Sequence, residues 1–266
     1  MVIAAIDATD LDDITSLQEE GWSDIRLAFT RYIEEPFSQP IKIAIDKQLA
    51  GVGAVIVHRD VAWLGHIIVQ KEHRGKGLGK IITETLVNLA NEQGCETIYL
   101  LATALGAPVY EKVGFVTETE YNIFTNIDLS TEATESGNIL SYNENFKQEI
   151  VVLDKITSAE DRLFYLKKFL KDSYLYINKN KVEGYYIPTL ENGPIIAKTQ
   201  DAGLALVKLH LKTHKQLIFP KENDLLVDFL HDKGYTPTSS CKRMRFGKWK
   251  ATKMAYIYNR IAGYLG

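Results

Sequence analysis

The chain has 266 residues, of which 45% are hydrophobic and 24% are charged, and its formal net charge is −3 at pH 7. The apolar fraction is close to the usual globular value of about 45–50%, which excludes disorder of the chain as a whole. A sequence pI of about 6.1 argues against a nucleic-acid-binding protein held by a general positive field. At roughly 100–200 residues per domain, the length predicts one large domain or two of ordinary size.

Composition also bounds the compartment. Two cysteines, Cys95 and Cys241, are too few for a disulfide framework or a cysteine-rich zinc site, so we expect no metal centre and a reducing cytosol. No stretch approaches the ~18 consecutive apolar residues of a membrane helix. The first 13 residues contain aspartates and no basic residue, unlike a secretory signal. We therefore predict a cytoplasmic protein with neither a membrane nor a nucleic acid as its partner.

The first half of the chain alternates strand and helix signals. Strands are expected at residues 2–6, 41–45, 52–57, 61–69 and 97–101. Helices are expected after a cap at Thr9 or Asp10, over residues 79–91, and over 108–113, where Gly114 ends the helix. The turn-like residues 46–48 predict a hairpin between the second and third strands. Alternating strands and helices indicate an α/β or α+β layer architecture.

Between about residues 128 and 145 the composition shifts to Ser, Thr, Glu, Asn and Gly, which predicts a linker. Further strands are then expected at residues 150–153, 174–177, 184–188, 193–197 and 216–219. Helices are expected over 158–171, capped by Ser158, and over 202–211 and 225–232.

A weak internal repeat relates the two halves. Gly-His-Ile-Ile-Val at residues 65–69 matches Gly-Pro-Ile-Ile-Ala at 193–197, and residues 109–115 match 229–235. Chance is the alternative, but the shared order of elements favours a duplicated unit. We therefore predict two domains, 1–127 and 146–266, joined by a linker at 128–145.

The segment Arg-Gly-Lys-Gly-Leu-Gly-Lys at residues 74–80 carries the clearest chemical signal. Its glycines allow positive φ and close approach of a ligand, and the first amides of the following helix lack intrahelical acceptors. The helix dipole and three basic side chains add positive charge, so the segment predicts a phosphate or pyrophosphate cradle. The alternative is a flexible basic turn. Walker and dinucleotide-binding loops fit poorly, because their glycine spacing and position in the fold differ.

Residues 74–79, placed directly after a strand, resemble motif A of the GNAT acetyltransferase superfamily, Arg/Gln-x-x-Gly-x-Gly/Ala. Residues 109–115 are similar to the superfamily's late Tyr-Glu-Lys-x-Gly-Phe signature. The second half resembles the degenerate GNAT-like domain of a two-domain bacterial subgroup, with Asn223 and residues 233–235 as anchors. The resemblance implies an α+β fold, with a mixed central sheet flanked by helices and a second, smaller GNAT-like domain.

The resemblance also implies that acetyl-CoA lies between the fourth and fifth strands. Backbone groups of the fourth strand would pair with the pantetheine arm, and amides of the loop would hold the pyrophosphate. The residues so implied in cofactor binding are Ile67, Ile68, Val69, Arg74, Gly75, Lys76, Gly77, Leu78, Gly79, Lys80 and Thr103. Thr103 is a departure, because many GNAT sequences carry an Asn at this position, seven residues before the conserved tyrosine.

Two side chains are candidates for acid–base chemistry. By the resemblance, Tyr110 would protonate the leaving thiolate or hydrogen-bond to it, and its alternative is a tyrosine packed on the core. His66, on the fourth strand, is a candidate for the base that takes the amine's proton, against a packed or cleft-lining histidine. Strict strand alternation places His66 on one face with Leu64 and Ile68, and Ile67 on the other.

Predictions can also be made for two aromatic side chains near the site, for the second half of the chain and for its C-terminal stretch. Trp22 is a candidate for lining the acceptor site or for the core, and His73 is expected to be a solvated flank of the loop. The second half is predicted to be non-catalytic. Residues 198–203 contain only one glycine together with the acidic Asp201, and Leu230 occupies the position that corresponds to Tyr110. The apolar stretch 249–265 is expected to pack on the body of the protein or in a homodimer contact.

The resulting hypothesis is an N-acetyltransferase in which an amine of a small-molecule or peptide acceptor attacks acetyl-CoA directly in a ternary complex. The alternative hypothesis, from a different functional class, is a non-catalytic sensor that binds acyl-CoA. A third hypothesis is an enzyme that acts on a nucleotide phosphate.

Overall fold

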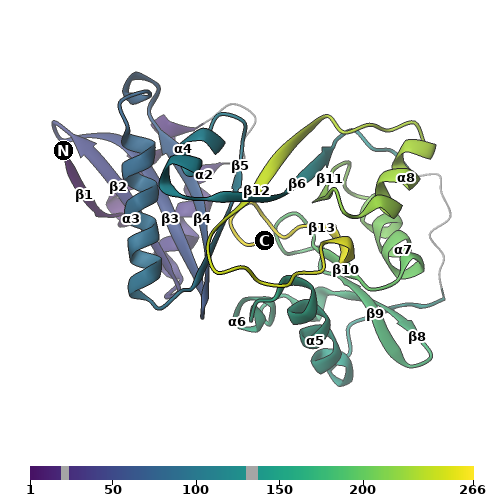
Figure 1. Ribbon diagram of the computed structural model, residues 1–266. Helices are drawn as coiled ribbons and strands as arrows, with labels where there is room; N and C mark the ends of the chain where they lie inside the picture. Colours follow the sequence, from purple (N-terminus) through teal and green to yellow (C-terminus); the bar gives the residue numbers. More distant parts are fainter. Residues whose placement is uncertain (19–23, 130–136) are drawn as a thin grey trace. The chain divides into compact units, whose positions relative to one another are not determined.

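The computed structural model describes residues 1–18, 24–129 and 137–266 (Figure 1). The chain divides into two compact units. Unit 1 comprises residues 1–118, 244–249 and 265, and unit 2 comprises 119–243, 250–264 and 266. The first unit thus ends earlier than the predicted boundary at residue 127 and includes a late segment, because β12 (Ser239–Gly247) contributes its last residues to it.

Unit 1 is built on a mixed sheet. Its strands are β1 (Val2–Ala5), β2 (Ser38–Ile45), β3 (Gln48–His58), β4 (Val61–Val69) and β5 (Thr97–Ala102), in that order. Unit 1 also includes the first residues of β6 (Val116–Phe124) and the last residues of β12. Its helices are α1 (Leu11–Ile14), α2 (Ile25–Glu34), α3 (Leu78–Glu92) and α4 (Ala107–Val113). Neighbouring strands from β1 to β4 are antiparallel, whereas β4 and β5 are parallel.

Local sequence explains most of these boundaries. Asp46 and Lys47 take positive φ values of 49° and 68°, which suits the tight turn of the predicted hairpin between β2 and β3. Gly114, with a φ of 107°, is the left-handed C-cap of α4. Asp10 is the N-cap of α1, as predicted, although its side chain makes no capping hydrogen bond there. Asp7, which was not predicted, caps the preceding 3-10 turn by accepting a hydrogen bond from the Thr9 amide.

The two faces of this sheet are packed differently. Helix α3 lies along one face, against β3 and β4 (Figure 1). Its buried side chains Ile82 and Leu86 join a cluster with Leu64 of β4 and Leu100 of β5, as the helical spacing predicted. Helix α2 packs against β2, and a separate small cluster holds Trp63 and Tyr99, with ring centroids 5.2 Å apart. The faces of β4 therefore have separate neighbours.

Unit 2 repeats much of this plan. Its helices are α5 (Lys147–Ser158), α6 (Leu163–Leu166), α7 (Gln200–His210) and α8 (Asp224–Asp232). Its strands are β7 (Ile139–Ser141), β8 (Tyr174–Asn178), β9 (Lys181–Tyr186), β10 (Ile195–Ala197), β11 (Leu217–Pro220) and β13 (Ile257–Asn259). The order β8-β9-β10-α7-β11-α8 repeats β2-β3-β4-α3-β5-α4 of unit 1, as the duplicated-unit reading predicted.

Three predictions for unit 2 were wrong. Residues 150–153, expected as a strand, lie inside α5, where Ile150 and Leu153 are buried while Val152 is 46% exposed, as an amphipathic helix requires. A short apolar run does not by itself distinguish strand from helix. The helix expected over 158–171 is reduced to the single turn of α6, because α5 ends at Ser158 and Ala159 is left-handed with a φ of 58°. Residues 139–141, inside the expected linker, form β7.

Residues 250–264 of the C-terminal stretch belong to unit 2, whereas Trp249, which is exposed, and Leu265 belong to unit 1. Strand β13 pairs antiparallel with β10, and Asn259 fixes its end through two donated hydrogen bonds, of 2.6 Å to the Asn192 carbonyl and 2.9 Å to the Gly193 carbonyl. The Ile218 amide of β11 donates to the Asn259 side chain at 2.9 Å. Strand β13 is therefore held on both sides, by β10 and by β11.

The ring of Tyr258 on β13 lies directly over α7. A Cβ added to Gly203 of α7 would lie 2.1 Å from the Cζ atom of this ring, and Tyr258 itself is buried. Glycine is therefore required at residue 203 by close packing, although it lowers helix propensity.

We predict that Gly203→Ala destabilises the protein by about 1–3 kcal/mol, because the added methyl group cannot fit beneath the ring. Urea unfolding would measure the change. The matched control is Gly203→Ala in a Tyr258→Leu background, where most of the cost disappears. A single variant as stable as the wild type would contradict this account of the packing.

Candidate functional site

A β-bulge interrupts strand β4 in the middle of the site. The register between β3 and β4 shifts between Val52 and Ala54, and on the facing stretch of β4 the residue His66 has a φ of 49°. A bulge adds one residue to one strand and reverses the alternation of its side chains. Accordingly Leu64 and Ile67 both belong to the α3 side, whereas His66 contacts α2. The prediction that Leu64 and His66 share a face was wrong for this reason.

Strands β4 and β5 pair only at their beginnings. Val61 to Trp63 pair with Thr97 to Tyr99, and beyond these residues the two fully described strands form no further ladder. The loss of pairing begins just before the bulge. The second half of β4, with Ile67, Ile68 and Val69, therefore lacks a β5 neighbour along its backbone, and this is where the predicted pantetheine contacts would lie.

The loop after β4 leads directly into α3. Gly75 and Gly77 have φ values of 75° and 85°, and a Cβ at either position would meet nothing within 4 Å. Gly77 is the N-cap of α3 and no side chain caps this end, so the first-turn amides of Leu78, Gly79 and Lys80 have no intrahelical acceptor. The loop thus presents backbone donors beside open space.

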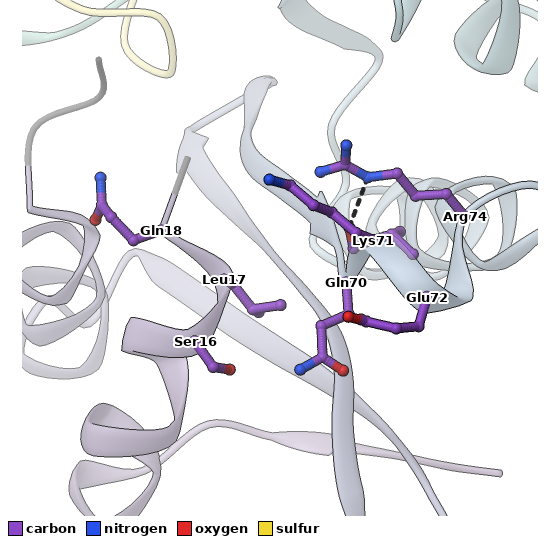
Figure 2. Close-up of a pocket in the computed structure, with 8 residues that line it drawn as sticks. Ser16, Leu17, Gln18, Gln70, Lys71, Glu72 and Arg74 are labelled. Atoms are coloured by element: carbon purple, nitrogen blue, oxygen red, sulfur yellow. Dashed lines mark hydrogen bonds between the residues drawn. The ribbon is translucent and has the colours of Figure 1, made fainter. Parts of the chain in front are cut away.

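Three basic side chains surround this turn: Arg74, Lys76 and Lys80, all of them exposed. Arg74 donates from Nε to the Val69 carbonyl at 3.0 Å (Figure 2), and Lys80 lies 3.5 Å from Glu84 in an exposed ion pair. Together with the positive end of the α3 dipole, these charges make the turn suited to a phosphate or another anion.

A small pocket of about 140 Å³ lies at the end of β4, beside this loop (Figure 2). It is lined by Ser16, Leu17, Gln18, Val69, Gln70, Lys71, Glu72 and Arg74. This volume is below the ~300–1,000 Å³ typical of small-molecule sites, so the pocket accounts for only part of a ligand site.

Helix α4 meets the loop at Gly79. A Cβ on Gly79 would lie 3.6 Å from Val109 and 3.9 Å from Val69, so the loop, the end of β4 and α4 converge there. Tyr110 follows Val109, its ring contacts Phe115 with centroids 6.2 Å apart, and burial raises the pKa of its hydroxyl to about 12. Tyr110 therefore keeps its proton throughout the physiological range.

Thr103 holds the turn that starts α4. Its hydroxyl accepts a hydrogen bond of 3.3 Å from the Gly106 amide, and its carbonyl accepts from the amides of Gly106 and Ala107. The residue is exposed at the end of β5. Its hydroxyl thus has a structural hydrogen bond, and a cofactor contact stays a prediction.

His66 lies in an aromatic cluster on the opposite side of β4 from α3. Its Nδ1 is 2.7 Å from the Tyr32 hydroxyl, and its ring makes edge contacts with Phe29 and Tyr32 of α2. Burial lowers the pKa of His66 to about 4, so the imidazole is neutral at physiological pH.

The sequence did not identify Tyr32 as part of the site. Ile25, Phe29 and Tyr32 are the buried side chains of α2, at helical spacing, and that pattern is typical of an ordinary core face. Of the other candidates, Trp22 lies outside the described residues, and His73 is half-buried rather than solvated, with a buried Nδ1 that has no partner among the described residues.

The described residues contain no group of His, Cys, Asp and Glu side chains placed to hold a metal ion. Within the same residues, none of the helices has the length and hydropathy needed to cross a membrane.

Comparison with known proteins agrees with this geometry. Residues 8–115, which include the N-terminal helices, β4, the glycine loop and α4, match the model of the acetyltransferase (GNAT) family. This segment is similar to GNAT-family domains. The match ends at Phe115, the last residue of the late signature, so both GNAT motifs named from the sequence lie within it.

Two curated relatives come from Bacillus subtilis (strain 168). The uncharacterized N-acetyltransferase YitH is 24% identical over 217 residues, which cover 76% of each chain. The uncharacterized N-acetyltransferase YobR is 30% identical over 115 residues, which cover 40% of this chain and 47% of YobR.

Two solved structures share the fold over nearly the whole chain. A Pyrococcus horikoshii protein assigned as an acetyltransferase superposes with a TM-score of 0.85 at 20% identity, covering 100% of this chain and 95% of its own. A tandem GNAT protein from the clavulanic acid biosynthesis pathway gives a TM-score of 0.60 at 11% identity, covering 94% and 99%. The α+β GNAT fold with a second GNAT-like unit is thereby confirmed.

Burial of His66 predicts a specific pH dependence of stability. In the unfolded chain the pKa of a histidine is about 6.5, whereas in the folded protein that of His66 is about 4. The unfolded state therefore binds an extra proton between these pH values, and the free energy of unfolding falls as the pH drops through this window.

Between pH 7 and pH 4 the buried His66 should lower the free energy of unfolding by roughly 2–3 kcal/mol, and we predict that His66→Gln abolishes this part of the decrease. Urea unfolding of both proteins at pH 7, 5.5 and 4.5 would measure it. The difference between the two proteins should be constant above pH 7 and shift in favour of the variant at lower pH. Two curves that run parallel over the whole range would contradict the burial of a neutral imidazole.

Proposed function

We propose that this chain is an acetyl-CoA-dependent N-acetyltransferase whose single catalytic unit is unit 1. It would move an acetyl group to the amine of a small-molecule or peptide acceptor, by direct attack within a ternary complex. The observation that carries the proposal is the glycine loop at 74–80, which opens the uncapped N-terminus of α3 after the half of β4 that has no β5 partner. The names of YitH and YobR, both N-acetyltransferases, support the same reaction class.

The residues present suit the cofactor. Gly75 and Gly77 leave open space beside the loop, the first-turn amides of α3 are donors, and Arg74, Lys76 and Lys80 supply positive charge for a diphosphate. Backbone groups of residues 67–69 would hold the pantetheine arm as an added strand. When bound, acetyl-CoA supplies an activated acetyl thioester.

Tyr110 is proposed as the acid. In the reaction the amine nitrogen bonds to the thioester carbon, the carbon–sulfur bond breaks, and the thiolate needs a proton or a hydrogen bond. Because burial raises the pKa of Tyr110 to about 12, its hydroxyl is protonated and able to donate at neutral pH. Its helix also contacts the loop through Val109 and Gly79.

His66 is proposed as the base. With a pKa of about 4, its imidazole is neutral and has a lone pair to accept the amine's proton. It lies on the α2 side of β4, whereas Tyr110 packs against the cluster beneath α3. Separate residues on separate sides of the strand would then serve the nucleophile and the leaving group.

Unit 2 is proposed to be non-catalytic. Strand β13 occupies the neighbouring position of β10 where β4 of unit 1 has none in its second half, and the ring of Tyr258 covers Gly203 near the start of α7. Residues 198–203 also hold only one glycine and one cation, Lys198, where the loop at 74–80 has three of each. The described part of unit 2 thus offers no counterpart of the proposed cofactor site.

We predict that calorimetry with acetyl-CoA gives saturable binding with one site per chain. Gly77→Glu/Gly79→Glu should abolish binding, because it adds negative charge and a side chain to the cradle and penalises the positive φ of Gly77. The charge-matched control is Asn91→Glu/Gln93→Glu, at the exposed far end of α3, which should bind normally. Absent binding, or equal binding by the loop variant, would contradict the proposal; two sites per chain would contradict the role given to unit 2.

For Tyr110→Phe we expect a fall in kcat of at least about tenfold with the KM for acetyl-CoA little changed, because only proton donation to the thiolate is lost. Thiol release with a panel of primary amines, aminosugars and lysine peptides would measure it. If the wild type binds acetyl-CoA but releases thiol with none of the amines, the acyl-CoA sensor is favoured. An unchanged kcat in the variant would remove Tyr110 from the mechanism.

A further inference from the structure

We propose that Tyr32 is a positioning residue for the reaction, an inference that rests on the proposed function of His66. Its phenolic oxygen accepts a hydrogen bond from Nδ1–H of His66, and this leaves the Nε2 lone pair to take the proton of the acceptor amine.

The contact joins α2, which packs against β2, to His66 of β4. Tyr32 is only 3% exposed, its hydroxyl lies 2.7 Å from His66 Nδ1, and the two rings meet at 65° with centroids 5.6 Å apart. Phe29, one turn earlier on α2, contacts the same imidazole with centroids 5.9 Å apart. Two aromatic side chains of one helix therefore fix the plane of the ring.

The bulge gives this contact its purpose. His66 is the bulged residue of β4 and has a φ of 49°, a conformation that is uncommon for residues other than glycine and persists where surrounding structure enforces it. Without the bulge, alternation would place His66 on the α3 side beside Leu64. The bulge turns the His66 side chain toward α2, where it contacts the hydroxyl of Tyr32.

Chemistry selects the direction of the hydrogen bond. A neutral imidazole has one N–H donor and one acceptor nitrogen, and both nitrogens become donors once it is protonated. If Tyr32 donated to Nδ1, the neutral imidazole would carry its proton on Nε2 and could take up a second proton only at Nδ1. The new Nδ1–H and the Tyr32 O–H would then be two donors facing each other. With Nδ1–H donating to Tyr32, the same hydrogen bond persists before and after proton uptake.

The proposed step moves one proton, from the acceptor amine to His66. The amine proton moves to Nε2 as the carbon–nitrogen bond forms, and the imidazolium keeps Nδ1–H on the Tyr32 oxygen until Nε2 releases its proton to solvent. The proton of Tyr32 is never transferred. Its oxygen also offsets part of the cost of a buried cation, because hydrogen bonding to the charged form favours that form.

The first test is spectroscopic and independent of any acceptor. In ¹⁵N-histidine-labelled protein, long-range ¹H–¹⁵N correlation should show His66 as the Nδ1–H tautomer at pH 7, with the resonance assigned by its absence from His66→Gln. In Tyr32→Phe this preference should be lost. Tyr99→Phe is the matched control, because Tyr99 is another buried tyrosine of unit 1, packed on Trp63, and it should leave the His66 signals unchanged.

The second test is kinetic, using acetyl-CoA and the most active amine of the panel. Tyr32→Phe should lower kcat by about 10–100-fold, part of the range of general acid–base catalysis, without changing the KM for acetyl-CoA. In a His66→Gln background the same substitution should have no further effect, because residues acting through one another are non-additive.

The proposal is overturned by a wild-type Nε2–H tautomer, by an unchanged kcat in Tyr32→Phe, or by an additive double variant. Failure of the proposed function gives a different result. The wild-type protein would then not bind acetyl-CoA, but NMR would still show whether Tyr32 sets the tautomer of His66.

Discussion

The bulge at His66 is the local constraint on which the arrangement of unit 1 depends. One additional residue in β4 shifts the register with β3 at Val52 and Ala54, and it follows directly on the last paired residues of β4 and β5. It also reverses which side chains face α3 and which face α2. The second half of β4 has no β5 partner, and within it the bulge turns an imidazole toward Tyr32. A left-handed non-glycine residue costs on the order of 1–3 kcal/mol, which the aromatic packing of Phe29 and Tyr32 helps to offset.

The two units show what one topology becomes when the neighbour of one strand changes. In unit 1, the second half of β4 has no β5 partner, and the loop that follows carries positive-φ glycines and cations. In unit 2, the equivalent β10 pairs with β13, and Asn259 and Tyr258 secure that strand against β11 and α7. The chain supplies in unit 2 the backbone partner that a ligand would supply in unit 1. Glycine is needed in both helices, at Gly77 for its φ and at Gly203 for the ring above it.

Charge and proton affinity are local properties of this protein. The net charge of −3 reveals nothing of a turn where Arg74, Lys76 and Lys80 surround uncapped amides. Burial shifts the two acid–base candidates apart, raising the pKa of Tyr110 to about 12 and lowering that of His66 to about 4. At neutral pH both are therefore uncharged, one holding a proton and the other able to accept one. Desolvation alone achieves this, because it disfavours the charged form of each group.

Several features of this protein follow from local chemistry and can be predicted from the order of the residues alone. Glycine spacing and cations predict the loop at 74–80, helical periodicity predicts α3, and Gly114 predicts the end of α4. The tertiary structure decided three things that no local pattern contains. It turned residues 150–153 into a helix, because their burial follows contacts with other strands and helices of unit 2. It brought Tyr32 to His66 across 34 residues of sequence, and it placed β13 beside β10. Local propensities act over a few residues, whereas a bulge and a strand's neighbours are set by packing between segments distant in sequence.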